Sequence, residues 1–181
     1  MLDLTKRNSL PNTISTGGRE FPVVTDFRAW MKFEIALTEI SVGDLIQVDY
    51  LFPEEKPRYC RIEDLLTFSR PRNELPRQIF SGPDVVVIDY KLDADFIFSA
   101  FLEQYKIDLV DIEYLHWHKF LALLNGLSDG TRLREIMGYR CYERTNEKEE
   151  LIRFKLKQAW EIDRISPEER AELKKFSDLF N

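Results

Sequence analysis

Apolar residues recur at three- and four-residue spacing along most of this chain, and this pattern predicts α-helices. Asp26 is the expected N-cap of a helix over residues 27–40, and Asp93 is the expected N-cap of a second helix. Shorter helices are predicted over residues 61–68 and 131–139. The fold class that the pattern predicts is therefore mainly α.

The longest predicted helix covers residues 109–125, between Asp108 and Gly126. One of its two apolar stripes consists of Val110, Tyr114, Trp117, Leu121 and Leu124. Such a stripe most often faces a core, but a helix that is apolar on two sides also occurs where half of it lies in an interface. Under that alternative, the partner-binding residues are Tyr114, Trp117, Leu121 and Leu124.

Strand is expected at two places at most. In residues 13–23 a Gly-Gly pair separates two short segments, as in a hairpin with a two-residue turn, and this register places Ile14 opposite Phe21. The β-branched residues 85–88 form either a short strand or the lead into the next helix. Helix should therefore exceed strand several-fold.

The composition changes after residue 143, where charged residues become dense and apolar residues sparse. This change predicts two parts. The first is a helical domain with the N-terminal hairpin over residues 1–143, and the second is a charged helical C-terminal arm over residues 144–181.

The 181-residue chain has a formal net charge of -6, whereas nucleic-acid binding normally rests on a basic surface, so no nucleic acid is expected as a partner. Cys60 and Cys141 lie far apart in the sequence, which favours reduced thiols over a disulfide framework. Charges interrupt every apolar stretch before it reaches membrane-spanning length, and the N-terminus lacks the apolar core of a signal peptide. These features predict a cytoplasmic protein without a membrane partner.

Candidate metal ligands are few and poorly spaced. His116 and His118 are two residues apart, and on a helix such residues point in different directions, so they are not expected to share a metal ion. Three clustered acids lack the glycine of a calcium loop, which favours a helix-capping role for Asp89, Asp93 and Asp95. Four arginines either contact phosphate or an acidic partner or form a solvated helix face, and the net acidity of the chain favours the solvated face: Arg132, Arg134, Arg140 and Arg144. We therefore expect no metal, no cofactor and no catalytic residues, in a protein that is not an enzyme and works by binding through apolar surface.

Four blocks in this order carry a resemblance: TDFRAWMKFE (25–34), DADFIFSAFLEQYKIDL (93–109), YLHWHKFLALLNGLSDGT (114–131) and IMGYR (136–140). They resemble the bacteriophage gene-product-fifteen family, found in tailed phages and prophages of Gram-positive bacteria. The resemblance covers about residues 10–140, and LHWHKF followed by IMGYR is its most specific part. One departure is His118, which stands where the family's pattern has a second tryptophan.

The resemblance implies a role in tail assembly, because such proteins are typically encoded in the tail module, close to the gene for the tape measure protein. It implies a tail assembly chaperone that keeps the tape measure protein soluble in the host cytoplasm while the tail tube is built. The alternative is a structural tail component that enters the virion as an oligomer. The expected partners are the tape measure protein or other tail proteins, and self-association into a homo-oligomer is left open. The family carries no catalytic residues that could be transferred to this chain.

Overall fold

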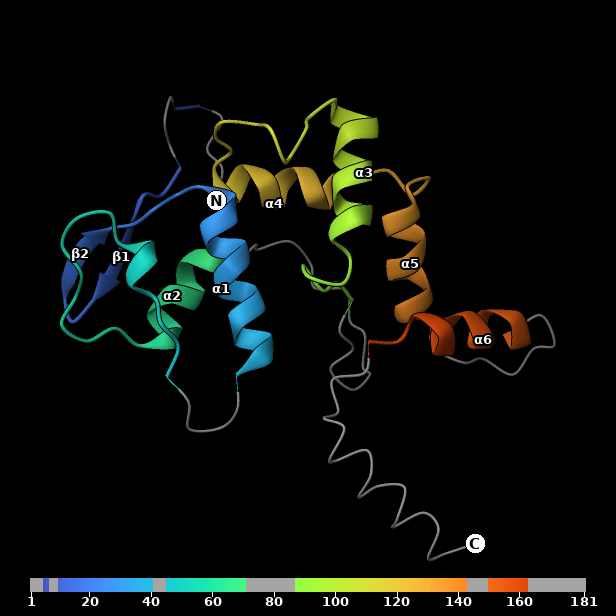
Figure 1. Cartoon of the computed structure of the whole chain (residues 1–181), viewed down its shortest axis with the longest axis horizontal. Coiled ribbons are helices and arrows are strands. Elements are labelled where there is room, and N and C mark those ends of the chain that lie inside the picture. The colour runs from blue at the N-terminus through green and yellow to red at the C-terminus, as the bar shows by residue number, and fades with distance from the viewer. Residues whose placement is uncertain (1–4, 7–9, 41–44, 71–86, 143–149, 163–181) are drawn as a thin grey trace, which may run out of the picture. The chain divides into compact units, whose positions relative to one another are not determined.

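A computed structural model of the chain describes residues 5–6, 10–40, 45–70, 87–142 and 150–162 (Figure 1). Within these ranges the chain forms one β-hairpin, one short 3-10 helix and six α-helices. In chain order they are β1 (Thr13–Thr16), β2 (Arg19–Pro22), α1 (Phe27–Glu39), η1 (Asp49–Leu51), α2 (Ile62–Ser69), α3 (Ala94–Tyr105), α4 (Trp117–Asn125), α5 (Arg132–Arg140) and α6 (Glu150–Trp160). The predicted fold class, mainly α with a small N-terminal hairpin, is confirmed.

The chain divides into two compact units. Unit 1 comprises Met1–Pro83 and Ile88–Glu135, and unit 2 comprises Asp84–Val87 and Ile136–Asn181. The hairpin and helices α1 to α4 belong to unit 1, α6 belongs to unit 2, and α5 begins in one unit and ends in the other. The predicted boundary at residues 143 and 144 lies outside the described residues, so the division into a domain and an arm stays a prediction.

The hairpin has the predicted register, with Ile14 opposite Phe21 and both side chains buried. Its turn residues, Gly17 and Gly18, have φ angles of 58° and 77°, a conformation that residues with a Cβ atom rarely adopt. Residues 87 and 88 are not part of a strand, and residues 85 and 86 lie outside the described ranges.

Two polar contacts hold α2 against its neighbours in unit 1. Near its start, Asp64 Oδ2 accepts a hydrogen bond from Thr16 Oγ1 at 2.7 Å, and this bond is the main reason that the pKa of Asp64 is lowered. At its end, the guanidinium of Arg70 donates to both carboxylate oxygens of Glu34 on α1, with Nε–Oε1 at 3.1 Å and Nη2–Oε2 at 2.6 Å. A bidentate pair fixes orientation as well as distance, so α2 is joined to both the hairpin and α1.

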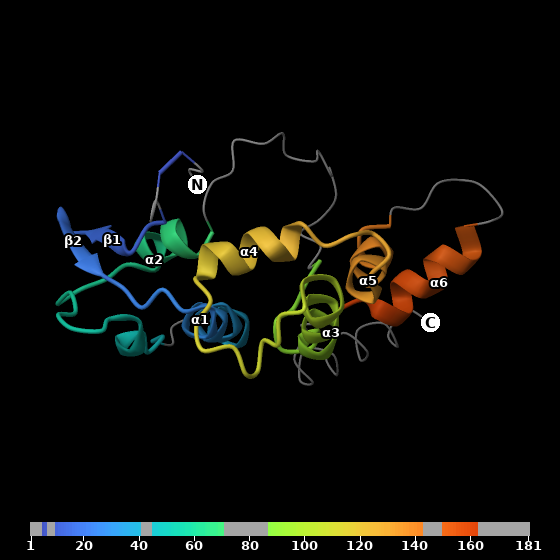
Figure 2. The same cartoon turned by 90° about the horizontal axis from the view of Figure 1, so that it is seen from above.

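Phe120 lies at the centre of an aromatic cluster in the core of unit 1. Its buried ring has its centroid 5.1 Å from that of Phe27, 5.2 Å from that of Phe101 and 5.5 Å from that of Trp117. These rings come from α1, α3 and α4, so the cluster joins three helices. Figures 1 and 2 show α4 crossing α1 and approaching α3 at its other end.

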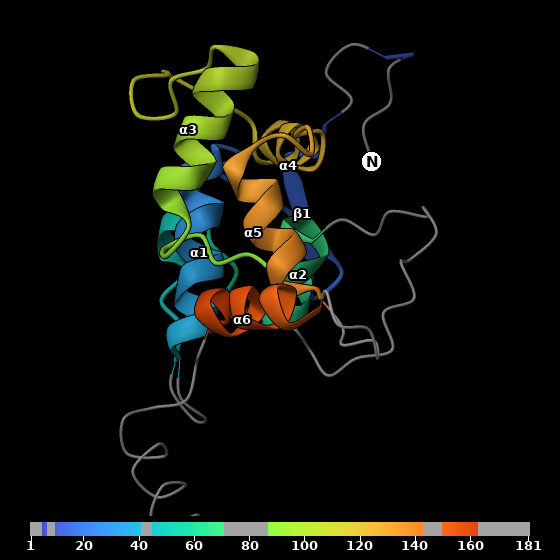
Figure 3. The ribbon, with the colours of Figure 1, turned by 90° about the vertical axis from the view of Figure 1, so that its right-hand side faces the viewer.

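Within unit 2, Arg140 joins the end of α5 to the end of α6. Its guanidinium is buried, and it donates from Nε to Trp160 O at 2.8 Å and from Nη1 to Val87 O at 3.1 Å. Figure 3 shows α6 lying across the end of α5. The prediction of a solvated face was therefore wrong for Arg140, because backbone carbonyls replace water around its charge; Arg144 lies outside the described residues.

The prediction of one helix over residues 109–125 was wrong in its first half, because α4 begins at Trp117. Asp108 Oδ1 accepts hydrogen bonds from the amides two and three residues later, at 2.8 and 3.1 Å, which is the geometry of a side-chain-stabilised turn. The carbonyl groups that follow are bonded by the side chain of Arg28 from α1. Tertiary contacts therefore override a helical pattern at this point.

Replacing Phe120 with Ala should lower the free energy of unfolding by about 3–5 kcal/mol, because the change leaves a cavity where three helices meet. Chemical denaturation followed by circular dichroism measures this loss. Tyr59→Ala is the control, since Tyr59 is 76% exposed, and it should change the stability by less than about 0.5 kcal/mol. An equally small effect of Phe120→Ala would contradict its central place in the core.

Candidate functional site

The connection between α3 and α4 carries two exposed apolar side chains. Val110 is 74% exposed and Tyr114 is 53% exposed, and the acids Asp111 and Glu113 beside them are exposed too. We call residues 108–115 the Tyr114 loop. Exposed apolar residues are common on any protein surface, so exposure alone does not mark a binding site. What distinguishes this loop is that its backbone is fixed by contacts with α1.

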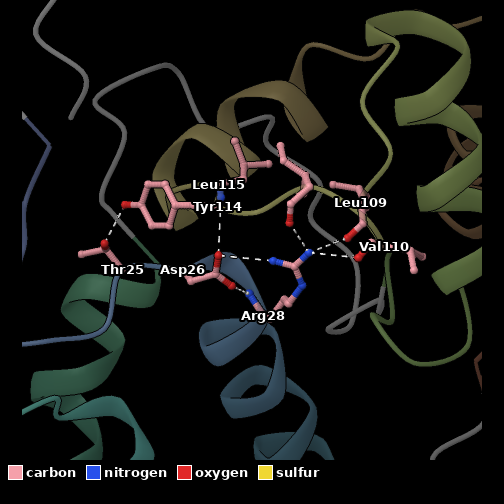
Figure 4. Close-up of polar contacts among 8 residues, drawn as sticks. Thr25, Asp26, Arg28, Leu109, Val110, Tyr114 and Leu115 are labelled. Carbon is pink, nitrogen blue, oxygen red and sulfur yellow. Dashed lines mark hydrogen bonds and ion pairs between the residues drawn. The ribbon is translucent and has the colours of Figure 1, made fainter.

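Arg28, in the first turn of α1, holds the middle of the Tyr114 loop (Figure 4). Its Nη2 donates to Leu109 O at 3.0 Å, to Val110 O at 3.3 Å and to Ile112 O at 2.7 Å. The same guanidinium lies 4.7 Å from the centroid of the Phe27 ring. Three carbonyls of the loop thus share the two protons of one nitrogen, while the guanidinium carbon lies over a core aromatic ring.

Asp26, the N-cap of α1, holds the end of the loop. Its Oδ1 accepts the amide of Arg28 at 3.0 Å, as the sequence predicted for a capping residue, and its Oδ2 accepts the amide of Leu115 at 3.4 Å. The two backbones also bond directly, from Phe27 N to Leu115 O at 2.9 Å and from Trp117 N to Thr25 O at 2.7 Å. The N-termini of α1 and α4 are thereby joined side by side.

The Tyr114 side chain is hydrogen-bonded at its hydroxyl, while its ring is exposed to solvent. Its hydroxyl shares a hydrogen bond of 2.7 Å with Thr25 Oγ1, and half of its surface remains exposed. In Figure 4, Tyr114 and Val110 lie on opposite sides of Arg28. The loop therefore presents two apolar contacts at positions set by α1, so it would lose little conformational entropy when a partner binds.

A family model described as "Bacteriophage Gp15 protein" matches residues 7–165 of this chain. The chain belongs to this family. The match confirms the resemblance inferred from the sequence blocks and makes this a bacteriophage protein. No curated protein and no solved structure matches the chain.

The four residues predicted to bind a partner differ in their exposure in this phage protein. Trp117 is buried, and its Nε1 donates to Ser69 O at 2.8 Å; Leu124 is buried as well. Leu121 is half-buried, and Tyr114 is the exposed member of the set. Trp117 and Leu124 thus belong to the core of unit 1, and partner binding by the set stays a prediction.

The two histidines lie together, contrary to the expectation that they diverge on a helix. His116 precedes α4 as its N-cap and is not a helical residue, so the helical spacing rule does not apply to the pair. Their ring centroids are 5.3 Å apart, and both side chains are buried. Among the described residues, no group of three or more His, Cys, Asp or Glu side chains is placed to hold a metal ion.

The clustered acids lie at chain turns. Asp89 Oδ1 accepts the amides of Lys91 and Leu92, and Asp93 Oδ2 accepts the amide of Asp89 just before α3. Asp93 stands at the N-cap position of α3 and Asp95 lies in the first turn, as expected, but the side chain of Asp93 bonds to the preceding turn and not to the start of the helix. The prediction of a side-chain cap was therefore wrong for Asp93. In the described part of the chain, no helix is both long enough and apolar enough to cross a membrane.

Sequence reasoning missed Arg28 as a functional residue, although one signal for it was present. A cation in the first turn of a helix is unfavourable next to the positive end of the helix dipole. An arginine two residues after the N-cap Asp26 therefore needs compensating contacts, which the Asp26 carboxylate and the carbonyls of the Tyr114 loop supply.

Arg28→Lys should loosen the Tyr114 loop, because one ammonium group cannot serve the loop carbonyls, as Nη2 does, and also pair with Asp26 Oδ2, as Nη1 does. We expect a loss of stability of about 1–2 kcal/mol and faster amide hydrogen exchange at residues 109–115, with exchange in the hairpin unchanged. Hydrogen exchange read by mass spectrometry checks this.

The matched control is Arg19→Lys, since the ion pair of Arg19 with Glu55 is exposed on both sides and contributes little. If both lysine variants exchange alike at residues 109–115, Arg28 is not the anchor of the loop.

Proposed function

We propose that this phage protein is a tail assembly chaperone, which binds the tape measure protein in the host cytoplasm while the tail tube is built. The family match supports a phage protein. The tail-module setting implied by the sequence blocks supports the narrower role. In this proposal the protein works by binding and is not an enzyme.

The observation that carries the proposal is the Tyr114 loop. Val110 and Tyr114 are exposed, while the backbone between them is fixed by Arg28 and Asp26. A tape measure protein is long and helical, and its apolar side chains need a cover until the tube surrounds them. Tyrosine suits this task because its broad ring gives contact area and its hydroxyl stays hydrogen-bonded.

The size of this surface suits a temporary partner. Two apolar side chains with an acidic surround bury far less area than a permanent interface does, so the complex would dissociate readily. Exposed Asp111 and Glu113 would favour contacts with basic residues of the partner and would mainly affect the association rate. A chaperone that must release its client benefits from both properties.

Co-expression should raise the soluble fraction of the tape measure protein from the same tail module, and the two proteins should co-purify. Tyr114→Asp should abolish co-purification, because it places a carboxylate where an apolar contact is made. The variant should still fold, since this side chain is half exposed and the new charge stays hydrated. The soluble fraction and a pull-down assay measure the outcome.

Tyr114→Phe is the matched control, because it removes the hydroxyl bonded to Thr25 and keeps the ring; it should still co-purify. Tyr59→Asp tests an exposed tyrosine elsewhere in the chain and should have no effect. Co-purification of Tyr114→Asp at the wild-type level would refute the loop as the binding surface. Stoichiometric protein in mature virions, with no effect on tape measure solubility, would favour the structural alternative.

Trp117→Asp should instead unfold the protein, because Trp117 is 1% exposed. An unpaired carboxylate in that position costs several kcal/mol, which is a large part of the stability of a domain. A circular dichroism melt checks this. A Trp117→Asp variant that folds but fails to bind the tape measure protein would show that Trp117 belongs to the interface.

A further inference from the structure

His116 acts as a side-chain cap for α4 in one protonation state only. Its Nδ1 accepts the amide of His118 at 3.0 Å, so Nδ1 carries a lone pair. Its Nε2 lies 3.0 Å from Pro11 O, and because a carbonyl oxygen only accepts, Nε2 carries the proton. A second proton, on Nδ1, would face an N–H group and break the cap.

His118 is constrained in a similar way. Its Nε2 lies 2.8 Å from Phe68 O, at the end of α2, and therefore donates. Its Nδ1 is buried and has no hydrogen-bond partner within the described part of the chain. The ring packs 4.7 Å from the Phe68 ring, centroid to centroid. A proton added to Nδ1 would be a buried donor with nothing to accept it.

The charges around the pair do not favour protonation. His118 and Lys119 both act against a charge on His116. Asp26 forms the backbone bridge with His116, but its carboxylate is already bonded to the amides of Arg28 and Leu115 and paired with the Arg28 guanidinium. On α2, the uncharged Phe68 contacts both histidines through its ring and bonds to His118 through its carbonyl oxygen.

We propose that His116 and His118 form a proton-sensitive latch, which ties the segment before β1 and the end of α2 to the N-terminus of α4 and opens on acidification. The latch joins three parts of unit 1 that are distant in sequence: Pro11, Phe68 and the start of α4. The two histidines are the only ones in the chain, so the histidine titration of the protein is that of the latch.

The direction of the pH effect follows from the folded environment. Burial, as the largest cause, lowers the pKa of both histidines below the unfolded value of 6.5. The latch therefore contributes its full stability above pH 6.5. That contribution is lost as the pH falls from this value through the folded-state pKa values, because the unfolded chain then binds protons that the folded chain does not.

The test compares wild type with the double variant His116→Asn/His118→Gln. Asparagine also accepts an amide at an N-cap and glutamine also donates to a carbonyl, but neither titrates. The melting temperature of wild type should fall between pH 7 and pH 5.5 (about the range in which histidine titrates) by more than that of the double variant. Equal pH dependence of the two proteins would overturn the proposal.

Nitrogen-15 NMR of the two imidazoles in the wild-type protein gives a second readout that does not depend on how the variant folds. At neutral pH both rings should be neutral with the proton on Nε2, and both should titrate below 6.5. A proton on Nδ1 of either ring, or a titration at or above the unfolded value, would refute the latch. His116→Ala should lower the melting temperature at every pH, because it removes the cap as well as the titrating group.

Discussion

The N-termini of α1 and α4 are joined by a backbone bridge between Asp26 and His116, and the arrangement of unit 1 depends on it. Each of these two residues uses its own side chain to cap the helix that it precedes. Unpaired amides at a helix start must find acceptors, and here both helices find them within a few residues of the bridge. The crossing of the helices is thereby fixed before any side chain of the core is considered, and it brings Phe27 of α1 onto Phe120 of α4.

Local signals in the sequence were sufficient where a short segment determines its own structure. The Asp26 cap and the hairpin register were predicted because each depends on residues only a few positions apart. The start of α4 was not predicted, because it depends on Arg28, which lies more than eighty positions earlier in the chain. Apolar spacing continues through residues 109–116 and gives no sign that their carbonyls are bonded elsewhere.

The same limit applies to the candidate site. The sequence analysis placed Tyr114, Trp117, Leu121 and Leu124 on one apolar stripe and raised both a core and an interface for it. It could not separate the two, since periodicity does not show what faces a stripe. Trp117 and Leu124 proved to be core residues, and Tyr114, assigned to the same stripe, precedes the helix and is exposed. The relation of the two histidines was misjudged for a different reason: His116 is the N-cap of α4, and an N-cap residue does not follow helical geometry.

In the proposed role an apolar surface stays available for a partner, and such a surface is difficult to keep exposed, because residues that would bind a partner would also pack into the protein's own core. In unit 1 the buried faces of α1 and α4 are already committed to the aromatic cluster around Phe120. The exposed Val110 and Tyr114 lie on the connection between α3 and α4, and a connection without anchoring contacts would collapse or disorder. Arg28 bonds to carbonyl groups of the Tyr114 loop and Asp26 bonds to one of its amides. These bonds keep the loop ordered and prevent it from collapsing onto the core. The polar contacts at the helix starts therefore have two effects: they set the crossing of the helices, and they keep Val110 and Tyr114 on the surface.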